Sequence, residues 1–218
     1  MKASRYRDIY RRLFAAYGHR YWWPGDSAFE VMVGAVLTQN TAWTNVEKAI
    51  SNLKQAEALS PETIVRIHPK RLASLIRPSG YYNIKSRRLR ALCRWVVAEG
   101  GVRKLARMPT DVLRPALLAV HGIGAETADD ILLYAFHRPV FVIDAYTRRI
   151  FARLGMVNGT EDYETLRGNF EHALGQDIPL YNEYHALIVR HGKDTCRKKP
   201  LCDVCCLARV CPSYNTTS

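Results

Sequence analysis

The sequence predicts an all-α protein, and three observations lead to this fold class. Apolar residues recur at helical spacing in one segment after another, many segments begin at residues typical of helix N-caps, and several end at glycine. The run PVFVID at 139–144 also fits a strand, but an extended connection between two helices fits equally well and no partner strand is evident. We therefore expect an array of helices joined by short connections.

Local signals mark where the helices begin and end. Glu30 stands three residues after Ser27, which forms a capping box ahead of an apolar segment. A second helix is expected after Ser60, because Pro61 is favoured at the first helical position. Further helices are expected over 85–100, 110–120, 145–155, 163–175 and 180–192, with Gly155, Gly175 and Gly192 closing the last three.

The stretch HGIGAETAD at 121–129 places two glycines, Gly122 and Gly124, between two apolar helical segments. This pattern predicts helix, hairpin and helix. Glycine allows positive φ and close approach of the backbone, so N–H groups at the start of the second helix can bind a phosphate. A tight turn with a purely structural role is the alternative. The other motifs of the sequence are needed to distinguish it from a phosphate-binding hairpin.

Composition restricts the class of partner. The chain has 218 residues, of which 48% are hydrophobic, enough for the core of one large or two small domains. Lys and Arg number 32 against 20 Asp and Glu, a net charge of +12, which favours a polyanion such as nucleic acid. No apolar run is long enough to span a bilayer, and the N-terminus lacks the apolar core of a secretory signal. We expect a cytoplasmic protein without a membrane partner.

Five of the six cysteines lie close together near the C-terminus. Cys196, Cys202, Cys205 and Cys211 are separated by five, two and five residues, and Cys206 is left over. In a reducing compartment such a set indicates metal ligation rather than disulfides. Four thiolates can bind Zn²⁺ or hold an iron–sulfur cluster, and the spacing does not choose between them.

Taken in order, these motifs resemble those of the endonuclease III superfamily of helix-hairpin-helix DNA glycosylases. LTQNT at 37–41, GYYNIKSRRL at 80–89, the hairpin, the VID segment and the cysteine loop follow one another as in that family. The resemblance covers nearly the whole chain. It implies two helical domains flanking a DNA-binding cleft: a six-helix barrel with the hairpin over 28–138, and a second domain formed by 1–27 and 139–218.

The resemblance also implies a cofactor and a reaction. A [4Fe–4S] cluster is expected on the four cysteines, with zinc as the alternative, although the first gap is five residues where the family commonly has six. The family's catalytic aspartate corresponds to Asp144. Its carboxylate would stabilise the oxocarbenium-like sugar and activate water as the damaged base leaves double-stranded DNA. From the sequence alone, Asp144 would be a helix N-cap.

Position 126 bears on whether the DNA strand is cut. Bifunctional members of the family carry a lysine here, whose amine attacks the sugar, whereas this chain has Glu126. A carboxylate cannot form a Schiff base, so we expect a monofunctional glycosylase with absent or weak lyase activity.

Several other residues are expected to contact DNA. Gln39 and Asn40 match the segment that inserts an amide into the gap left by the flipped nucleotide, with hydrogen bonding between helices as the alternative. Lys85 is expected to bind phosphate. The remaining DNA-binding residues are expected in the hairpin: Gly122, Ile123, Gly124 and Thr127.

Three tryptophans, Trp22, Trp23 and Trp43, are expected to line the pocket for the extruded base, with a role in the core as the alternative. WWP, GAVLTQNT, RPSGYYN and GIGAETAD resemble most closely the branch that includes 3-methyladenine DNA glycosylase III. A cationic alkylated purine would gain about 0.5–2 kcal/mol per aromatic ring from cation–π attraction.

The resemblance therefore favours removal of alkylated bases by a monomer that works at the nucleoid. One alternative is excision of oxidised or deaminated pyrimidines, including uracil and mismatched thymine. Another is a non-catalytic helix-hairpin-helix protein that only binds DNA.

Overall fold

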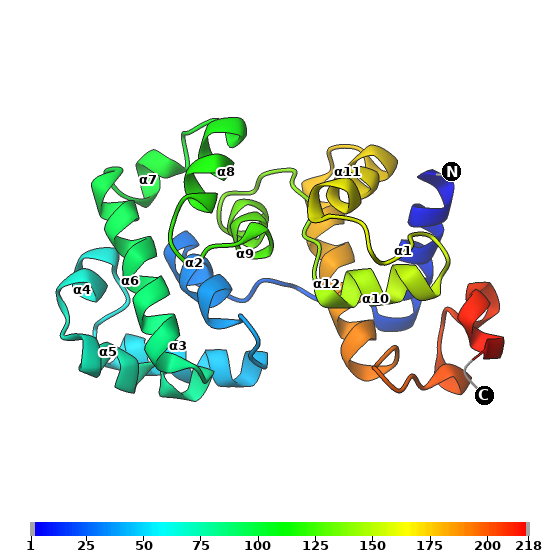
Figure 1. The fold of residues 1–218 in the computed structure, drawn as a ribbon, viewed down its shortest axis with the longest axis horizontal. Helices are drawn as coiled ribbons and strands as arrows, with labels where there is room; N and C mark the ends of the chain where they lie inside the picture. Colours follow the sequence, from blue (N-terminus) through cyan, green and yellow to red (C-terminus); the bar gives the residue numbers. More distant parts are fainter. Residues whose placement is uncertain (1–2, 217–218) are drawn as a thin grey trace. The chain divides into compact units, whose positions relative to one another are not determined.

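The structure, a computed structural model, describes residues 3–216 and confirms the all-α fold, with no strand in this part of the chain (Figure 1). The chain divides into two compact units. One, the inner unit, is Pro24–Arg138. The other, the outer unit, comprises Met1–Trp23 and Pro139–Ser218, of which residues 3–23 and 139–216 are described.

The inner unit is built around α2 (Ala28–Leu37), whose residues from Phe29 onward are all buried. Apart from Glu30, the side chains of this helix are apolar on every side, as expected of a helix in the centre of a domain. It packs against α3 (Trp43–Gln55), α6 (Tyr82–Ala98), α9 (Ala125–Asp130) and the π-helical η2 (Ile131–Ala135). The unit also contains α4 (Pro61–Arg66), α5 (Pro69–Leu75), η1 (Arg77–Ser79), α7 (Val102–Leu105) and α8 (Thr110–Leu118).

The expected N-caps of the inner unit are confirmed. The Ser27 side chain accepts a hydrogen bond from the Glu30 N–H at 3.2 Å, and Ser60 accepts one from Thr63 ahead of α4. The reciprocal hydrogen bond of the capping box is shifted by one residue. The Glu30 carboxylate accepts from the N–H of Asp26 and not from that of Ser27.

The outer unit consists of α1 (Ala3–Tyr17), α10 (Ala145–Arg153), α11 (Tyr163–Leu174) and α12 (Ile178–Asp194). Three short 3₁₀ turns follow: η3 (Cys202–Val204), η4 (Ala208–Val210) and η5 (Pro212–Thr216). Aromatic rings fill its core. Phe170 stacks on Phe141 at 4.3 Å between ring centroids and meets Tyr6 edge-on at 4.8 Å. Such pairs add about 0.5–1.5 kcal/mol each to the free energy of area burial.

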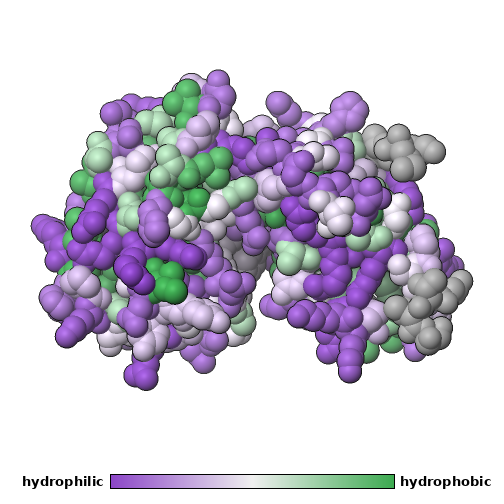
Figure 2. Space-filling view, viewed as in Figure 1, coloured by the Kyte–Doolittle hydropathy of each residue, from purple (hydrophilic) through white to green (hydrophobic). Residues whose placement is uncertain are grey.

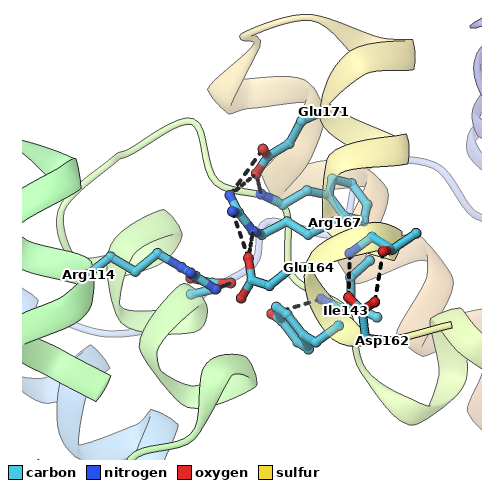
Figure 3. Close-up of polar contacts among 10 residues, drawn as sticks. Arg114, Ile143, Asp162, Glu164, Arg167 and Glu171 are labelled. Carbon is cyan, nitrogen blue, oxygen red and sulfur yellow. Dashed lines mark hydrogen bonds and ion pairs between the residues drawn. The ribbon is translucent and has the colours of Figure 1, made fainter. Parts of the chain in front are cut away.

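The segment over residues 139–143 is an extended connection and not a strand. Side chains of α11 satisfy its backbone in place of a partner strand. The N–H of Phe141 donates to Glu171 Oε1 at 3.0 Å, and that of Ile143 donates to the Tyr163 hydroxyl at 3.3 Å (Figure 3). This connection ends at Asp144 and so sets the position of that residue.

One expected helix end is wrong. Gly175 ends α11 with φ of +74° and Gly155 follows α10 with φ of +62°, but Gly192 lies inside α12. A Cβ at Gly192 would approach side-chain atoms of Tyr146 to 2.5–2.8 Å. This glycine therefore allows α10 and α12 to pack closely, which the sequence signal for a helix end could not distinguish.

Hydrophilic side chains cover most of the face drawn in Figure 2, with hydrophobic residues exposed in small patches. Among the described residues, no helix is both long and apolar enough to cross a membrane.

Candidate active site, DNA-binding hairpin and cysteine loop

Asp144 is the N-cap of α10, with extended backbone, and the residue is 7% exposed. Its Oδ1 accepts two hydrogen bonds from Thr147, from the backbone N–H at 2.7 Å and from the hydroxyl at 2.8 Å. The N-cap position predicted from sequence is therefore present. The acid is fixed at the positive end of a helix, where a carboxylate is stabilised.

His185, on α12, is the neighbour of Asp144 that sequence reasoning missed. Its Nε2 lies 3.6 Å from Asp144 Oδ2, and both side chains are buried. A histidine on the buried side of a helix gives no local signal that it faces an aspartate so far away in the sequence. Only the packing of α10 on α12 brings the two groups together.

The surroundings keep the Asp144 carboxyl ionised. Burial acts to raise its pKa, but His185 and the two hydrogen bonds from Thr147 outweigh burial, and the net pKa lies below the ordinary value. A buried anion next to a helix N-terminus can stabilise a developing positive charge.

The hairpin between α8 and α9 requires glycine at one of its two glycine positions. Gly122 has φ of +86°, and a Cβ there would lie 2.2 Å from Arg88 Cγ. Gly124 is the N-cap of α9 with extended backbone, and a Cβ there would meet nothing within 4 Å. Gly122 thus makes the turn and allows the Arg88 side chain to cross it.

Gln39 links the hairpin to the end of α2. Its amide nitrogen donates to the Gly122 carbonyl at 3.1 Å and to the Thr127 hydroxyl at 2.9 Å. Its amide oxygen accepts from Arg88 at 2.6 Å. In this structure the Gln39 amide therefore forms the interhelical hydrogen bonds that the sequence left as an alternative.

The other residues of the hairpin differ in whether their side chains are buried or exposed. Ile123 and Thr127 are buried, so their side chains fasten the hairpin to the inner unit instead of reaching outward. Glu126 is exposed in the first turn of α9, where the helix dipole favours an acid.

We expect Gly122→Ala to destabilise the protein and weaken DNA binding. The positive φ and the displaced Arg88 together should lower the free energy of unfolding by about 1–3 kcal/mol. DNA affinity should fall at least about fivefold, because Arg88 also holds Gln39. Urea unfolding and fluorescence anisotropy measure the two effects. Gly168→Ala, in open space within α11, is the control and should leave both unchanged or raise stability slightly.

The structure places Lys85, which was expected to bind phosphate, in the interior of the inner unit. Its side chain is 1% exposed, and its ammonium group donates to the carbonyls of Leu37 and Ser79 at 2.7 and 2.8 Å and to the Thr41 hydroxyl at 2.5 Å. Burial, with a smaller contribution from nearby Arg88, lowers the pKa of Lys85 to about 8. Lys85 therefore joins α6, α2 and η1 inside the unit.

The same contacts bring three loops together, which we call the loop cluster: residues 38–42, 79–82 and 120–124. The Thr41 hydroxyl donates to the Ser79 carbonyl, and Gln39 reaches the hairpin. Asn40 and Tyr81 both have positive φ and are exposed, Tyr81 by 71%. Asn40 was expected from the sequence to contact DNA and Tyr81 was not, although two adjacent tyrosines after a glycine were a visible signal.

The three tryptophans belong to two different units. Trp22 and Trp23 are half-buried in the outer unit, with ring centroids 5.0 Å apart and planes tilted by 49°. Trp43 is half-buried at the start of α3 in the inner unit. The structure therefore brings two of the three expected pocket aromatics together.

The four expected ligand cysteines line one pocket. Cys196, Cys202, Cys205 and Cys211 all border it, and Cys206 does not. Among the described residues, no three His, Cys, Asp or Glu side chains are grouped as a site for a single metal ion. Sulfur donors around a shared pocket suit a soft metal centre such as zinc or an iron–sulfur cluster.

Two arginines of α10 fasten the cysteine loop. Arg149 donates to the carbonyls of Cys196 and Gly192, each at 2.9 Å. Arg153 donates to Cys196 Sγ at 3.2 Å and to the carbonyl of Arg197 at 2.6 Å. The helix that carries Asp144 at its start therefore holds the loop at its end.

His191 of α12 contacts the loop from the other side. Its Nε2 lies 3.6 Å from Cys205 Sγ and its Nδ1 lies 2.8 Å from the Tyr17 hydroxyl. Burial lowers the pKa of His191 to about 4, so the ring is neutral at pH 7. Burial, with the neighbouring cysteines as smaller contributors, raises the pKa of Cys205 to about 11.

Fold and sequence define the class of protein. Residues 33–175, more than half of the chain, match the family described as "HhH-GPD superfamily base excision DNA repair protein". The chain belongs to this superfamily and is a base excision repair DNA glycosylase.

Individual relatives agree with this class. The chain is 47% identical to "Putative DNA repair glycosylase MJ1434" of Methanocaldococcus jannaschii, over 94% of each protein. It is 31% identical to endonuclease III of Thermotoga maritima, over 85% of this chain and 83% of the relative.

Solved structures show the same fold. 3-Methyladenine DNA glycosylase (MagIII) of H. pylori, bound to 1,N6-ethenoadenine, matches with a TM-score of 0.77 and 30% identity, over 88% of this chain and 98% of that one. An endonuclease III–DNA complex matches with a TM-score of 0.85 at 20% identity, over 99% and 98% of the two chains, which is a likeness of fold alone.

Proposed function

We propose that the protein is a monofunctional DNA glycosylase that removes alkylated purines and uses Asp144 as its catalytic carboxylate. The buried carboxylate at the start of α10, with its lowered pKa, carries the catalytic part of this proposal. The identity of 30% to the H. pylori 3-methyladenine DNA glycosylase supports the substrate class.

In this mechanism the bond between sugar C1′ and the base nitrogen breaks, and its electron pair leaves with the base. The Asp144 carboxylate stabilises the positive charge that develops on the sugar. Water then bonds to C1′ and gives its proton to the carboxylate, which releases it to solvent. The products are the free base and an abasic site in an unbroken strand.

Alkylation at N3 or N7 makes a purine cationic and a good leaving group, so the enzyme needs no strong general acid. The adjacent rings of Trp22 and Trp23 offer aromatic faces to such a base, for about 0.5–2 kcal/mol per ring. Trp43, at the start of α3, stays a candidate for contact with the extruded base.

We infer that the loop cluster binds the duplex. The hairpin would bind the backbone with N–H groups, while exposed Asn40 and Tyr81 would hydrogen-bond and stack at the site of the extruded nucleotide. Gln39 would join them only by leaving its three hydrogen bonds in the hairpin.

The four pocket-lining cysteines would hold a [4Fe–4S] cluster, or zinc in the alternative. When bound, this group cross-links the loop and fixes it to the outer unit. We further propose that the enzyme acts as a monomer on damaged double-stranded DNA, in the cytoplasm at the nucleoid.

The identity to endonuclease III of T. maritima favours a second substrate class, damaged pyrimidines. A direct test uses duplexes that each contain one lesion: a stable 3-methyladenine analogue, uracil or thymine glycol. Base release and strand nicking are scored separately, with borohydride present to trap a Schiff base. We expect release of the alkylated purine without nicking or trapping, and release of thymine glycol or uracil alone would overturn the substrate proposal.

Glu126 variants test the monofunctional part. Glu126→Lys places an amine at the position where bifunctional members of the superfamily carry one, so we expect a borohydride-trapped complex from this variant. Glu126→Gln is the matched control and should trap nothing. A trapped complex with the wild-type protein would mean that another amine acts and that the chain is not monofunctional.

A further inference from the structure

The two oxygens of Asp144 have different surroundings. Oδ1 accepts both hydrogen bonds from Thr147 and is committed to the cap of α10. Oδ2 faces His185 Nε2 at 3.6 Å, which is ion-pair distance. Only Oδ2 is therefore available to a substrate or to water, and His185 is next to it.

Charged groups on α10, α11 and α12 other than His185 are engaged with other partners. Arg148 of α10 donates to the carbonyl of Glu161 at 2.6 Å. On α11, Arg167 joins Glu164 and Glu171, as Figure 3 shows, and Glu171 also accepts from Phe141.

On α12 itself, Glu183 accepts from the N–H of Arg20 at 2.7 Å. Within the part of the chain that the structure describes, His185 is the basic side chain that lies within 4.0 Å of an Asp144 carboxylate oxygen.

We propose that His185 is a positioning residue for catalysis, which holds the Asp144 carboxylate ionised and directs Oδ2. The proposal rests on the function proposed above, in which Asp144 is the catalytic carboxylate. The cap fixes one oxygen and the imidazole attracts the other, so the carboxylate has one orientation. The distance of 3.6 Å is too long for a strong hydrogen bond, so the negative charge stays available to the sugar.

The direction of the pH effect follows from the burial of Asp144. Without the imidazole, burial would dominate, and the carboxyl would bind a proton at higher pH than in the wild type. Activity requires the ionised form, so the acid limb of the pH–rate profile should move to higher pH in a variant without His185.

The experiment measures single-turnover release of the alkylated base from pH 4.5 to 9 in His185→Asn and His185→Gln. His172→Asn, an exposed histidine in the last turn of α11, is the matched control. We expect the rate to fall at least about tenfold at the acid end and only about two- to threefold at the alkaline end. The Kd for lesion DNA should stay within about twofold of the wild type.

An equal loss of rate at every pH, or an unshifted acid limb, would overturn the proposal and leave His185 a packing residue. Urea unfolding checks that the variants are folded. If neither variant folds, the pH–rate profile of the wild type still tests the proposal. An acid limb with an apparent pKa above the usual range of aspartate would contradict it. Full activity of Asp144→Asn would instead overturn the proposed function itself, so the two failures are distinguishable.

Discussion

Asp144→Asn is expected to lower base release by about 10³-fold or more while DNA affinity stays near that of the wild type. Asparagine retains an oxygen that can accept from the Thr147 N–H, so the cap of α10 should survive. What is lost is the negative charge that stabilises the sugar cation. Single-turnover kinetics and anisotropy on the same lesion duplex separate the two effects.

Asp162 provides a matched control for this substitution. It caps α11 as Asp144 caps α10, with two hydrogen bonds from the threonine three residues later, but it is exposed. Asp162→Asn makes the same chemical change at the same kind of position and should leave base release unchanged. If Asp144→Asn were as active as this control, the chain would be a DNA-binding protein or would use another catalytic group.

Cys202→Ser should remove most of the bound iron and destabilise the outer unit by more than about 4 kcal/mol. The reason is that a loop with only short 3₁₀ turns of its own would depend on the proposed metal centre for its stability. Iron analysis should find about four iron atoms per chain in the wild type, with absorbance in the visible range. Thermal unfolding measures the loss of stability.

Cys206→Ser is the control, because Cys206 does not border the pocket. It should keep the iron and the visible absorbance. Zinc in place of iron in the wild type would establish the alternative metal. Full iron in Cys202→Ser, together with loss in Cys206→Ser, would mean that the ligand set is different from the one proposed here.

Features that depend on neighbours in sequence were predicted well. The N-caps at Ser27, Ser60 and Asp144 depend on contacts within three residues, so local spacing was enough to find them. Gly122 was also recognisable, since a turn between two apolar helices calls for positive φ.

Features that depend on distant contacts were not predicted. Gly192 resembles a helix end, but its reason is the Tyr146 side chain on another helix. Lys85 resembles a phosphate ligand among several basic residues, yet its acceptors come from Leu37, Thr41 and Ser79.

For the candidate site, Asp144 was predicted from the sequence as a helix N-cap, and its proposed catalytic role came from the resemblance to the endonuclease III superfamily. His185 could not be found in this way, because a histidine among apolar residues is most often an ordinary core residue. Tyr81 lies within a motif noted in the sequence, but it is set apart from Tyr82 only in the folded chain, by its exposure and its positive φ.

Helices α10 and α12 each reach from the Asp144–His185 pair to the cysteine loop, α10 through Arg149 and Arg153 and α12 through His191. Backbone amides at the start of α10 should therefore exchange with solvent deuterium together with those of the loop, as one cooperative unit. Loss of the loop's contacts should then also loosen the Asp144 carboxylate at the start of α10.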